Sequence, residues 1–563
     1  MSELIDEPIL EMGEIQGNIF PGFMKNYQMF LGLKILNEPE NIQLAKAWIA
    51  SITPEIATAA EVLKFKELRN LMINRGSYRS GRLAVCWINI AFSSQGLKKL
   101  LADPTEIDRF ADKGFKVGLP GRATTIGDPD DTDNLEGSPK NWKIGGTPDT
   151  IPDIFLIVAS DLPTQLEVTV EQIKKSLKQT ATSVDKPTIT SGLKIIYEEL
   201  GENLPGELSG HEHFGFKDGI SQPGIRGRLP EPPHNFLTPR YIDPQDELSQ
   251  LFSKPGQPLV WPGQFVFGYA AQSDQKPTDG ICSTSEPTDG ICPIEPTWAK
   301  NGSFLVFRRL RQDVGSFWKF MHSKAKELAT EDGFSDLDGE RLAALLVGRW
   351  KSGAPIMRTP NQDNNELSKD GFANNHFNFD QKSRRISLIP GQPDDGYELA
   401  PEDREGLRCP HASHIRKVNP RDITTEQGSD TDTLKRRILR RGIPFGKVLD
   451  DPNNPDVDPL QGNRGLFFLS YQTSITDQFE FLSKNWMNAE KAPEENPGGN
   501  DLIVGQNNNL GQNRKRRCTI RRKVNGQTKE ARIEFETDWV IPTGGGYFFS
   551  PSITTLKDIL GAS

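Results

Sequence analysis

Cysteine and histidine are both scarce in this chain of 563 residues. Its five cysteines are odd in number, and only Cys282 and Cys292 lie close together in the sequence. Such scattered cysteines do not form the disulfide framework of a small secreted protein, and they favour a reducing compartment. Only seven histidines occur, so any histidine-dependent chemistry has to draw on a short set of candidates.

The sequence also lacks a long apolar run and a basic leader. No run of about 18 apolar residues occurs that would span a bilayer. The first residues, MSELIDE, are acidic and do not match the basic start of a secretory signal. We therefore expect no membrane partner and a cytoplasmic location.

An excess of positive charge is missing as well, since the net charge is −9. Nucleic-acid binding depends on a basic field, so we expect no nucleic-acid partner. The one basic run, at 514–517 and 521–523, is interrupted by Cys518, Thr519 and Ile520. That pattern is typical of a solvated strand.

The length predicts more than one domain, because a single core rarely grows to this size. In the first 200 residues, hydrophobic patterning and turn residues predict alternating strands and helices. The strands are expected at 28–36, 82–92, 153–160 and 193–200, and the helices at 39–52, 94–101 and 163–179. The two long helices give the order β-α-β-β-α-β, the ferredoxin-like signature.

A weaker version of this order occurs in the second half. Strands are expected at 264–270, 303–310 and 465–472, and helices at 312–330 and 473–486. We therefore predict an α+β fold of two ferredoxin-like domains, with antiparallel sheets and peripheral helices. The predicted domains are residues 1–210 and residues 211–563, the second with long loop insertions.

One short repeat is plain, because PTDGIC at 277–282 recurs at 287–292. Asp-Gly is a turn signal, so a duplication within a surface loop is the favoured interpretation. Cys282 and Cys292 could pair or bind a metal, but no histidine or further cysteine lies nearby in the sequence.

Common catalytic motifs do not explain the histidines. His211 and His213 have no spaced cysteine or carboxylate partners to complete a zinc site. No HExxH, P-loop or G-x-S-x-G motif occurs. From spacing alone, each histidine is more simply a packed or surface residue.

Two longer segments change that interpretation. HFGFKDGISQPG at 213–224 resembles the GxxDG signature of dye-decolorising peroxidases, and CPHASHIRKVNPR at 409–421 resembles the proximal segment of that family. Further matches follow in the family's order along nearly the whole chain. They lie at 14–23, 302–310, 348–355, 439–446, 465–472 and 544–553.

The resemblance implies two ferredoxin-like domains that enclose a haem. His414 would be the metal ligand, and neutral imidazole is a suitable axial ligand for a peroxidase. Asp218 would carry out the acid–base step, and its carboxylate favours activity at acidic pH unless burial raises its pKa. Arg440 would stabilise the departing negative oxygen. Arg441 is the rival for that last role.

Other residues would complete the cofactor site. Ile220, Ser221 and Gln222 follow the GxxDG motif, and Leu466 and Phe468 alternate on one face of a strand as apolar walls. Arg416 either pairs with a haem propionate or forms a surface salt bridge.

A carboxylate partner for His414 is expected from the helix after Gln472. Asp477 and Glu480 are equal candidates there, and either could instead be a solvated helix residue.

The implied function is a peroxidase with one haem b per chain. It would use hydrogen peroxide to oxidise bulky aromatic compounds and anthraquinone-type dyes through a ferryl intermediate, with electrons passing through surface Trp or Tyr. Self-association, for example as a dimer, is also implied. The alternatives are a haem-binding or haem-transfer protein without significant turnover, and an interaction module without a cofactor. The presence of both Asp218 and Arg440 favours catalysis.

Overall fold

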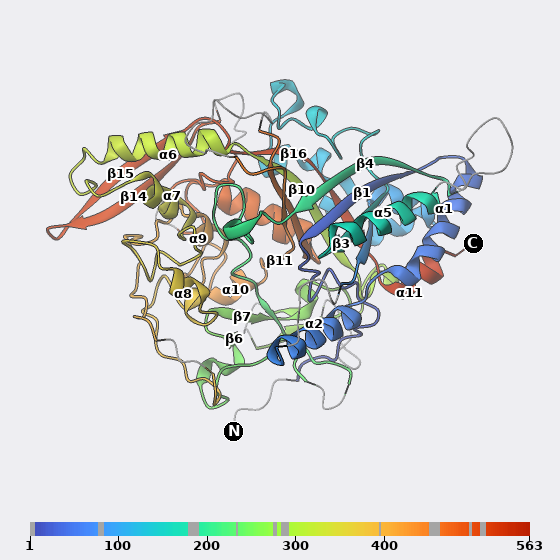
Figure 1. Cartoon of the computed structure of the whole chain (residues 1–563), viewed down its shortest axis with the longest axis horizontal. Helices are drawn as coiled ribbons and strands as arrows, with labels where there is room; N and C mark the ends of the chain where they lie inside the picture. The colour runs from blue at the N-terminus through green and yellow to red at the C-terminus, as the bar shows by residue number, and fades with distance from the viewer. Residues whose placement is uncertain are drawn as a thin grey trace.

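One antiparallel sheet runs through both halves of the protein (Figure 1). The structure is a computed structural model, and it describes residues 6–76, 84–177, 191–231, 235–273, 278–282, 292–392, 396–449, 462–494, 498–506 and 514–562. The strand order is β11-β13-β10-β16-β2-β3-β1-β4, with β12 paired to β13.

The first four strands form a ferredoxin-like unit. Its elements are β1 (Tyr27–Ile35), α1 (Pro39–Ile52), β2 (Trp87–Phe92), β3 (Ile154–Ser160), α5 (Pro163–Leu177) and β4 (Leu193–Glu202). The strands pair in the order β2-β3-β1-β4, all antiparallel. Helix α5 buries Leu166, Val170, Ile173 and Leu177, which recur at the helical period and form its core-facing stripe.

The second half repeats this arrangement. Its elements are β10 (Ser303–Gln312), α6 (Val314–Leu328), β11 (Leu439–Arg440), β13 (Gly465–Gln472) and β16 (Val540–Ser550). Their order, β11-β13-β10-β16, matches that of the first unit, and the pairing of Phe549 with Phe92 joins the two. The predicted fold class is therefore confirmed, while a domain boundary at residue 210 stays a prediction.

Two parts of the second half differ from the sequence expectations. The strand predicted at 264–270 is wrong, because the chain forms a short 3-10 helix at Pro262–Gln264 and turns at Gly268, where φ is +91°. Strand β16, which is the last in the sequence and lies between β10 and β2 in the sheet, was not predicted.

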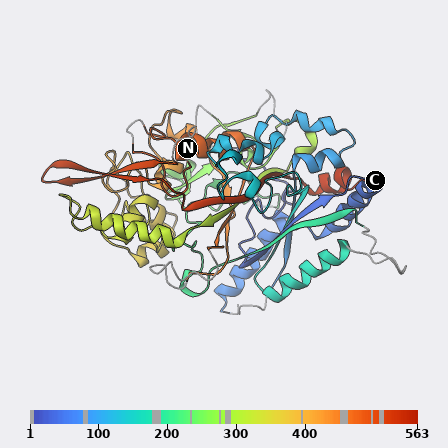
Figure 2. The same ribbon diagram turned by 90° about the horizontal axis from the view of Figure 1, so that it is seen from above.

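The basic run lies on β14 (Arg516–Val524) except for Arg514 and Lys515, which confirms the predicted strand, although Arg516 is buried rather than solvated. It pairs with β15 (Gln527–Phe535), and this hairpin extends from the body beside α6 (Figure 2).

The remaining named elements are mostly short. They are α2 (Ala59–Asn74), α3 (Ser94–Leu100), α4 (Lys113–Val117), β5 (Gly224–Ile225), β6 (Phe252–Lys254), β7 (Gln257–Val260), β8 (Ala271–Gln272), β9 (Gly280–Ile281), α7 (Gly339–Val347), α8 (Asn365–Lys369), α9 (His414–Val418), α10 (Asp430–Leu434), β12 (Ile443–Phe445) and α11 (Ile553–Thr555).

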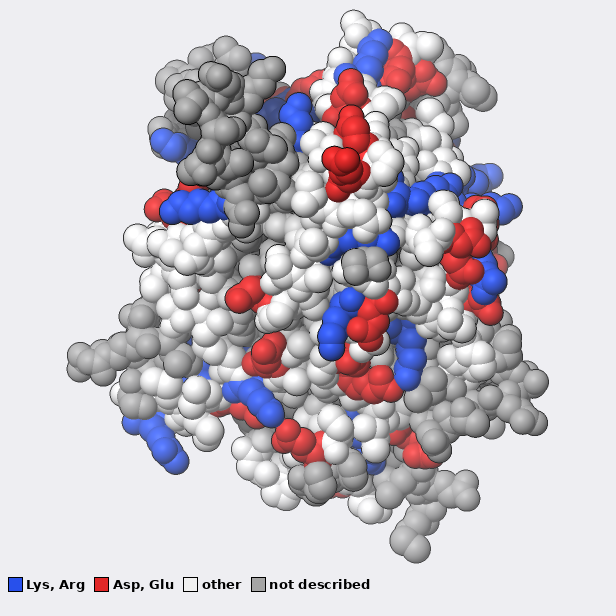
Figure 3. Space-filling model, turned by 90° about the vertical axis from the view of Figure 1, so that its right-hand side faces the viewer, with Lys and Arg blue, Asp and Glu red and all other residues white. Residues whose placement is uncertain are grey.

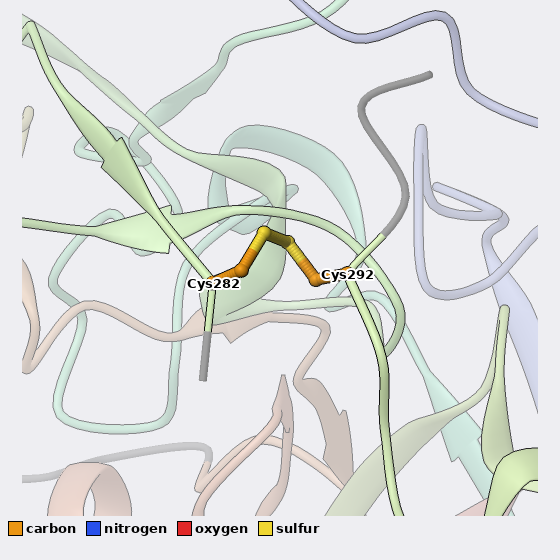
Figure 4. Close-up of a disulfide and its surroundings, with 2 residues drawn as sticks. All are labelled: Cys282 and Cys292. Carbon is orange, nitrogen blue, oxygen red and sulfur yellow. A yellow bond between two sulfur atoms is a disulfide. The ribbon is translucent and has the colours of Figure 1, made fainter. Parts of the chain in front are cut away.

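Cys282 and Cys292 form a disulfide, which the sequence interpretation did not favour (Figure 4). Strand β9 pairs with β8 just before Cys282, and the Cys292 N–H donates to Gly268 O at 2.9 Å. These contacts bring the two Cα atoms to 5.2 Å. The rest of the repeat, at 283–291, lies outside the described residues. Since disulfides persist mainly in oxidising compartments, cysteine usage no longer supports the cytoplasmic location, which stays a prediction.

Charged side chains of both signs are interspersed on the face shown in Figure 3. Among the described helices, none is long and apolar enough to cross a bilayer.

Candidate active site

His414 begins α9 at the wall of a cavity of about 340 Å³. Its Nδ1 lies 2.7 Å from Oδ2 of Asp501, whose side chain is fully buried. With Nδ1–H donating to this carboxylate, the Nε2 lone pair is left available to a metal. The pair thus has the form of an anchored axial ligand.

Asp501 is itself held by backbone groups. Its Oδ1 accepts hydrogen bonds from the N–H groups of Ile503 and Val504, at 2.9 and 3.2 Å. Its own N–H donates to Met487 O. The carboxylate is therefore oriented toward His414 before any cofactor binds.

The two carboxylates expected beside His414 lie elsewhere, so that prediction is wrong. The Asp477 side chain is 74% exposed, and its backbone N–H is capped by Ser474. Glu480 is buried, but it accepts hydrogen bonds from Arg122 and from the Tyr547 hydroxyl. The helical segment Ile475–Glu480, which carries both carboxylates, thus directs them away from His414.

We expect Asp501→Asn to weaken haem retention or peroxide activity by about 10–100-fold, because the imidazole loses its carboxylate partner. The measurement is the rate of haem transfer to excess apo-globin, together with peroxide turnover per haem. Asp477→Asn is the matched control and should leave both unchanged. Equal behaviour of the two variants would contradict the role of Asp501.

Asp218 and Arg440 meet on another wall of the same cavity. Arg440 Nη1 donates to Asp218 Oδ1 at 2.8 Å, and its Nη2 donates to Ser221 O at 2.9 Å. The side-chain amide of Gln222 accepts a hydrogen bond from the Arg440 N–H and donates one to the Arg440 carbonyl. The GxxDG segment and β11 are thereby held together.

Two opposing effects set the acidity of Asp218. Burial raises its pKa, but the charge of Arg440 and hydrogen bonds from Gly219 N–H and Arg440 outweigh burial, so the pKa lies below its ordinary value. The charged form is therefore present above that lowered pKa and is lost only in stronger acid. The carboxylate remains a proton acceptor at acidic pH.

The structure separates Arg440 from its neighbour. Arg441 donates to Asn18 O and Ile19 O at 3.0 and 2.7 Å, and burial lowers its pKa to about 10. Its guanidinium thus anchors the N-terminal segment, whereas that of Arg440 contacts Asp218. Of the two arginines, Arg440 has the geometry to act with Asp218.

The other predicted cofactor contacts divide into two groups. The cavity is lined by Ile220, Ser221, Gln222, Leu466 and Phe468, and their contact with a cofactor stays a prediction.

Arg416 is not among the cavity-lining residues. It is fully buried, with Nε 2.6 Å from Glu494 Oε1 and Nη1 donating to Cys409 O at 2.9 Å. Neither a propionate contact nor a surface salt bridge describes it.

Three other arginines line the cavity without an ion-pair partner among the described residues: Arg349, Arg421 and Arg437. Burial lowers the pKa of Arg349 and of Arg437 to about 10, and that of Arg421 falls further because burial is joined by the charges of the other two. The Nε of Arg437 is buried and has no hydrogen-bond partner among the described residues. Arg349 and Arg421 lie within the matches at 348–355 and 409–421, but the sequence interpretation gave none of the three arginines a role.

These arginines and His414 supply what a haem requires. Arg349 and Arg421 donate to carbonyl and amide oxygens, but no carboxylate among the described residues neutralises their charge. Such cations suit carboxylate groups such as propionates, because a charge away from water is costly until it is paired. The free imidazole nitrogen suits iron, and the apolar walls at Leu466 and Phe468 suit a macrocycle. The cavity therefore fits an anionic, planar metal cofactor.

A second cavity, of about 480 Å³, adjoins the first. Asp218, Gly219, Gln222, Arg440 and Leu466 line both. The Asp218–Arg440 pair thus stands between two spaces.

Comparisons with known proteins agree with this geometry. Residues 14–189 match the DyP dimeric alpha+beta barrel domain, and residues 358–496 match the C-terminal domain of Dyp-type peroxidases. Peroxidase 2 of Mycetinis scorodonius is 30% identical over 98% of this chain and 88% of its own. The chain belongs to the dye-decolorising peroxidase family.

Further members of the dye-decolorising peroxidase family support this family assignment. A dye-decolorizing peroxidase of Auricularia auricula-judae is 30% identical over 98% of this chain and 87% of its own. The structure of an ancestral D-type dye-decolorizing peroxidase matches with a TM-score of 0.71 and 31% identity, covering 99% of this chain and 100% of the other. The protein is thus a haem-dependent peroxidase.

Proposed function

We propose that this peroxidase uses hydrogen peroxide to oxidise aromatic compounds and dyes, with Asp218 and Arg440 acting on the peroxide. The observation that carries the proposal is the 2.8 Å contact between these two residues on the cavity that His414 also lines. A sequestering protein needs an axial ligand but not this acid–base pair.

The cofactor we propose is one haem b per chain. His414 would hold its iron through Nε2, with Asp501 maintaining the imidazole's orientation and basicity, and Arg349, Arg421 and Arg437 would face its propionates. When bound, haem would supply the redox chemistry by which the two oxidising equivalents of peroxide reach the reductants.

The protein's own residues handle protons and charge. Asp218 would accept a proton from one peroxide oxygen through its carboxylate and return it to the other oxygen. Arg440 would balance the negative charge that develops as the O–O bond breaks. Because Arg440 already lies against Asp218, little reorganisation is needed at that moment.

Peroxide and reductant have separate requirements. The second cavity borders Asp218 and Arg440, so we assign it as the route by which peroxide reaches them. One structurally similar dye-decolorizing peroxidase, with a TM-score of 0.66 and 25% identity, was solved in complex with 2,6-dimethoxyphenol. Phenols and bulkier anthraquinone dyes are the reductants we propose here, the latter through surface Trp or Tyr.

We also propose that the protein forms a dimer and is located in the cytoplasm. Sedimentation would test the assembly, and cell fractionation would test the location. Recovery of the protein in an oxidising compartment, where Cys282 and Cys292 stay paired, would contradict the cytoplasmic location.

Replacing His414 with alanine tests the cofactor site. We expect wild-type protein to show a Soret band and His414→Ala to lose it, because the remaining contacts lack an axial ligand. The measurement is the absorption spectrum after saturation with haemin and gel filtration, with His322→Ala, outside the cavity lining, as the control. A Soret band with no dye bleaching in the wild type would favour haem transfer instead.

A further inference from the structure

The loop that carries Asp218 closes around the side chain of one of its own residues. His211 pairs with Lys217 across the loop, and the Asp218 N–H donates to Gly210 O at 3.0 Å. Glu212 lies inside, with its own N–H donating to Phe216 O at 3.0 Å. The position of Asp218 therefore depends on how the loop tip is held.

The Glu212 carboxylate holds that tip from within. Its Oε1 accepts from the N–H of Phe216 at 2.8 Å, and its Oε2 accepts from the N–H of Phe214 at 2.9 Å. The Oε2 atom also accepts from the side-chain amide of Gln312. Because Gln312 ends β10, the carboxylate connects the loop to the central sheet.

Glu212 is also electrostatically close to Asp218. Burial raises the pKa of Glu212 to about 7; its three hydrogen bonds oppose this rise, and the charge of Asp218 adds to it. Glu212 lines both cavities, as Asp218 does. The half-buried Glu212 carboxylate is costly to lose, because its partners Phe214, Phe216 and Gln312 would remain buried with unpaired donors.

We propose that Glu212 is a positioning residue for the peroxide reaction, holding the loop so that Asp218 stays paired with Arg440 and open to the cavity. The proposal rests on the proposed role of Asp218 and assigns Glu212 no contact with the reacting atoms. Its effect passes through the hydrogen bonds to Phe214 and Phe216.

Two variants separate the reach of the side chain from its acceptor chemistry. Glu212→Asp keeps a carboxyl group but is one methylene too short to hold both N–H groups, and Glu212→Gln keeps the length but brings an amide toward three donors. In haem-loaded protein, both should lower the bimolecular rate constant with hydrogen peroxide by about 10–10²-fold, the scale of a misplacement near 1 Å.

The pH profile is the readout that a general loss of stability would not move. The charges that act on Asp218 are Arg440 on β11, His414 on α9 and Glu212 of its own loop. His211 and Lys217 pair with each other in that loop, and Arg349 lies near Arg440. If the loop loosens, Asp218 loses the nearby charge of Arg440 and its pKa rises. The acid limb of the pH–rate profile, where the rate falls as the pH falls, should therefore move to higher pH in Glu212→Asp. Amide hydrogen exchange of segment 213–219 should become faster.

The matched control is Glu199→Gln, which removes a carboxylate that lines neither cavity and is paired with the buried Arg309 at 2.7 Å. It should lower stability and leave the acid limb and the exchange of 213–219 unchanged. Full peroxide reactivity in Glu212→Asp would overturn the positioning role, and so would slowing without a shift of the limb. If neither Glu212 variant folds, Gln312→Leu should show the same shift, and its absence would be equally decisive.

Failure of the underlying function gives a different result. If Asp218→Asn reacts with peroxide at the full rate, the role of Asp218 is wrong, whatever Glu212 does. If Asp218→Asn is slow and both Glu212 variants are fast, only the positioning role is wrong.

Discussion

Replacing Asp218 with asparagine is expected to slow the reaction with hydrogen peroxide by about 10²–10⁴-fold, while haem content stays at the wild-type level. Asparagine preserves the shape of the side chain and an oxygen that can accept from Gly219 and Arg440. It cannot take a proton from peroxide at any working pH. The measurement is the second-order rate constant from stopped-flow absorption, normalised to haem.

Asp112→Asn is the control for this variant. Asp112 is also a well-bonded aspartate, accepting from Phe115 N–H and Thr476 N–H, but it does not line either cavity. Its variant should lose stability and keep the peroxide rate. If Asp112→Asn and Asp218→Asn slow the reaction equally, the assignment of Asp218 as the acid–base group is wrong.

Replacing Arg440 with leucine is expected to lower the same rate constant by about 10²–10³-fold, the usual effect of removing one fixed donor from a developing oxyanion. A second effect has a definite sign. Without Arg440, Asp218 loses a nearby charge and a hydrogen bond that both lower its pKa, so that pKa rises. The acid limb of the rate should therefore move to higher pH by about 1–3 pH units.

Arg311→Leu is the matched control, because Arg311 pairs with Glu136 away from both cavities. It should change neither the rate nor the limb. A slowed Arg440→Leu whose acid limb coincides with that of the wild type would show that Arg440 does not set the acidity of Asp218. The rate and the limb thus test two roles of one side chain.

Local patterns in the sequence were sufficient for the elements of the first unit and for the site's principal residues. Strand β3 is a nearly continuous apolar run, β1 is mostly apolar, and α5 has a clear helical stripe. Asp218 and His414 lie within short contiguous motifs, so their identification did not depend on long-range contacts. The strand predicted at 264–270 failed because its apolar pattern is interrupted by a turn at Gly268.

Carboxylates that distant segments bring to the site could not be identified from such local patterns. Asp501 lies 87 positions after His414, in a loop without a recognisable motif, and only the packing of that loop brings them together. Asp477 and Glu480 follow a predicted strand and were therefore plausible candidates, yet the helix directs them elsewhere. Glu212 was visible only as a neighbour of the GxxDG motif.

By itself, the sequence determined the fold class and the family and pointed to Asp218 and His414, because each depends on adjacent residues or on a regular period. The tertiary structure decided that Arg440 rather than Arg441 faces Asp218, that Arg416 is buried away from the cavity, and that Asp501 is the partner of His414. Those choices depend on which way a side chain points and on what distant segments place beside it. Neither is encoded in local spacing.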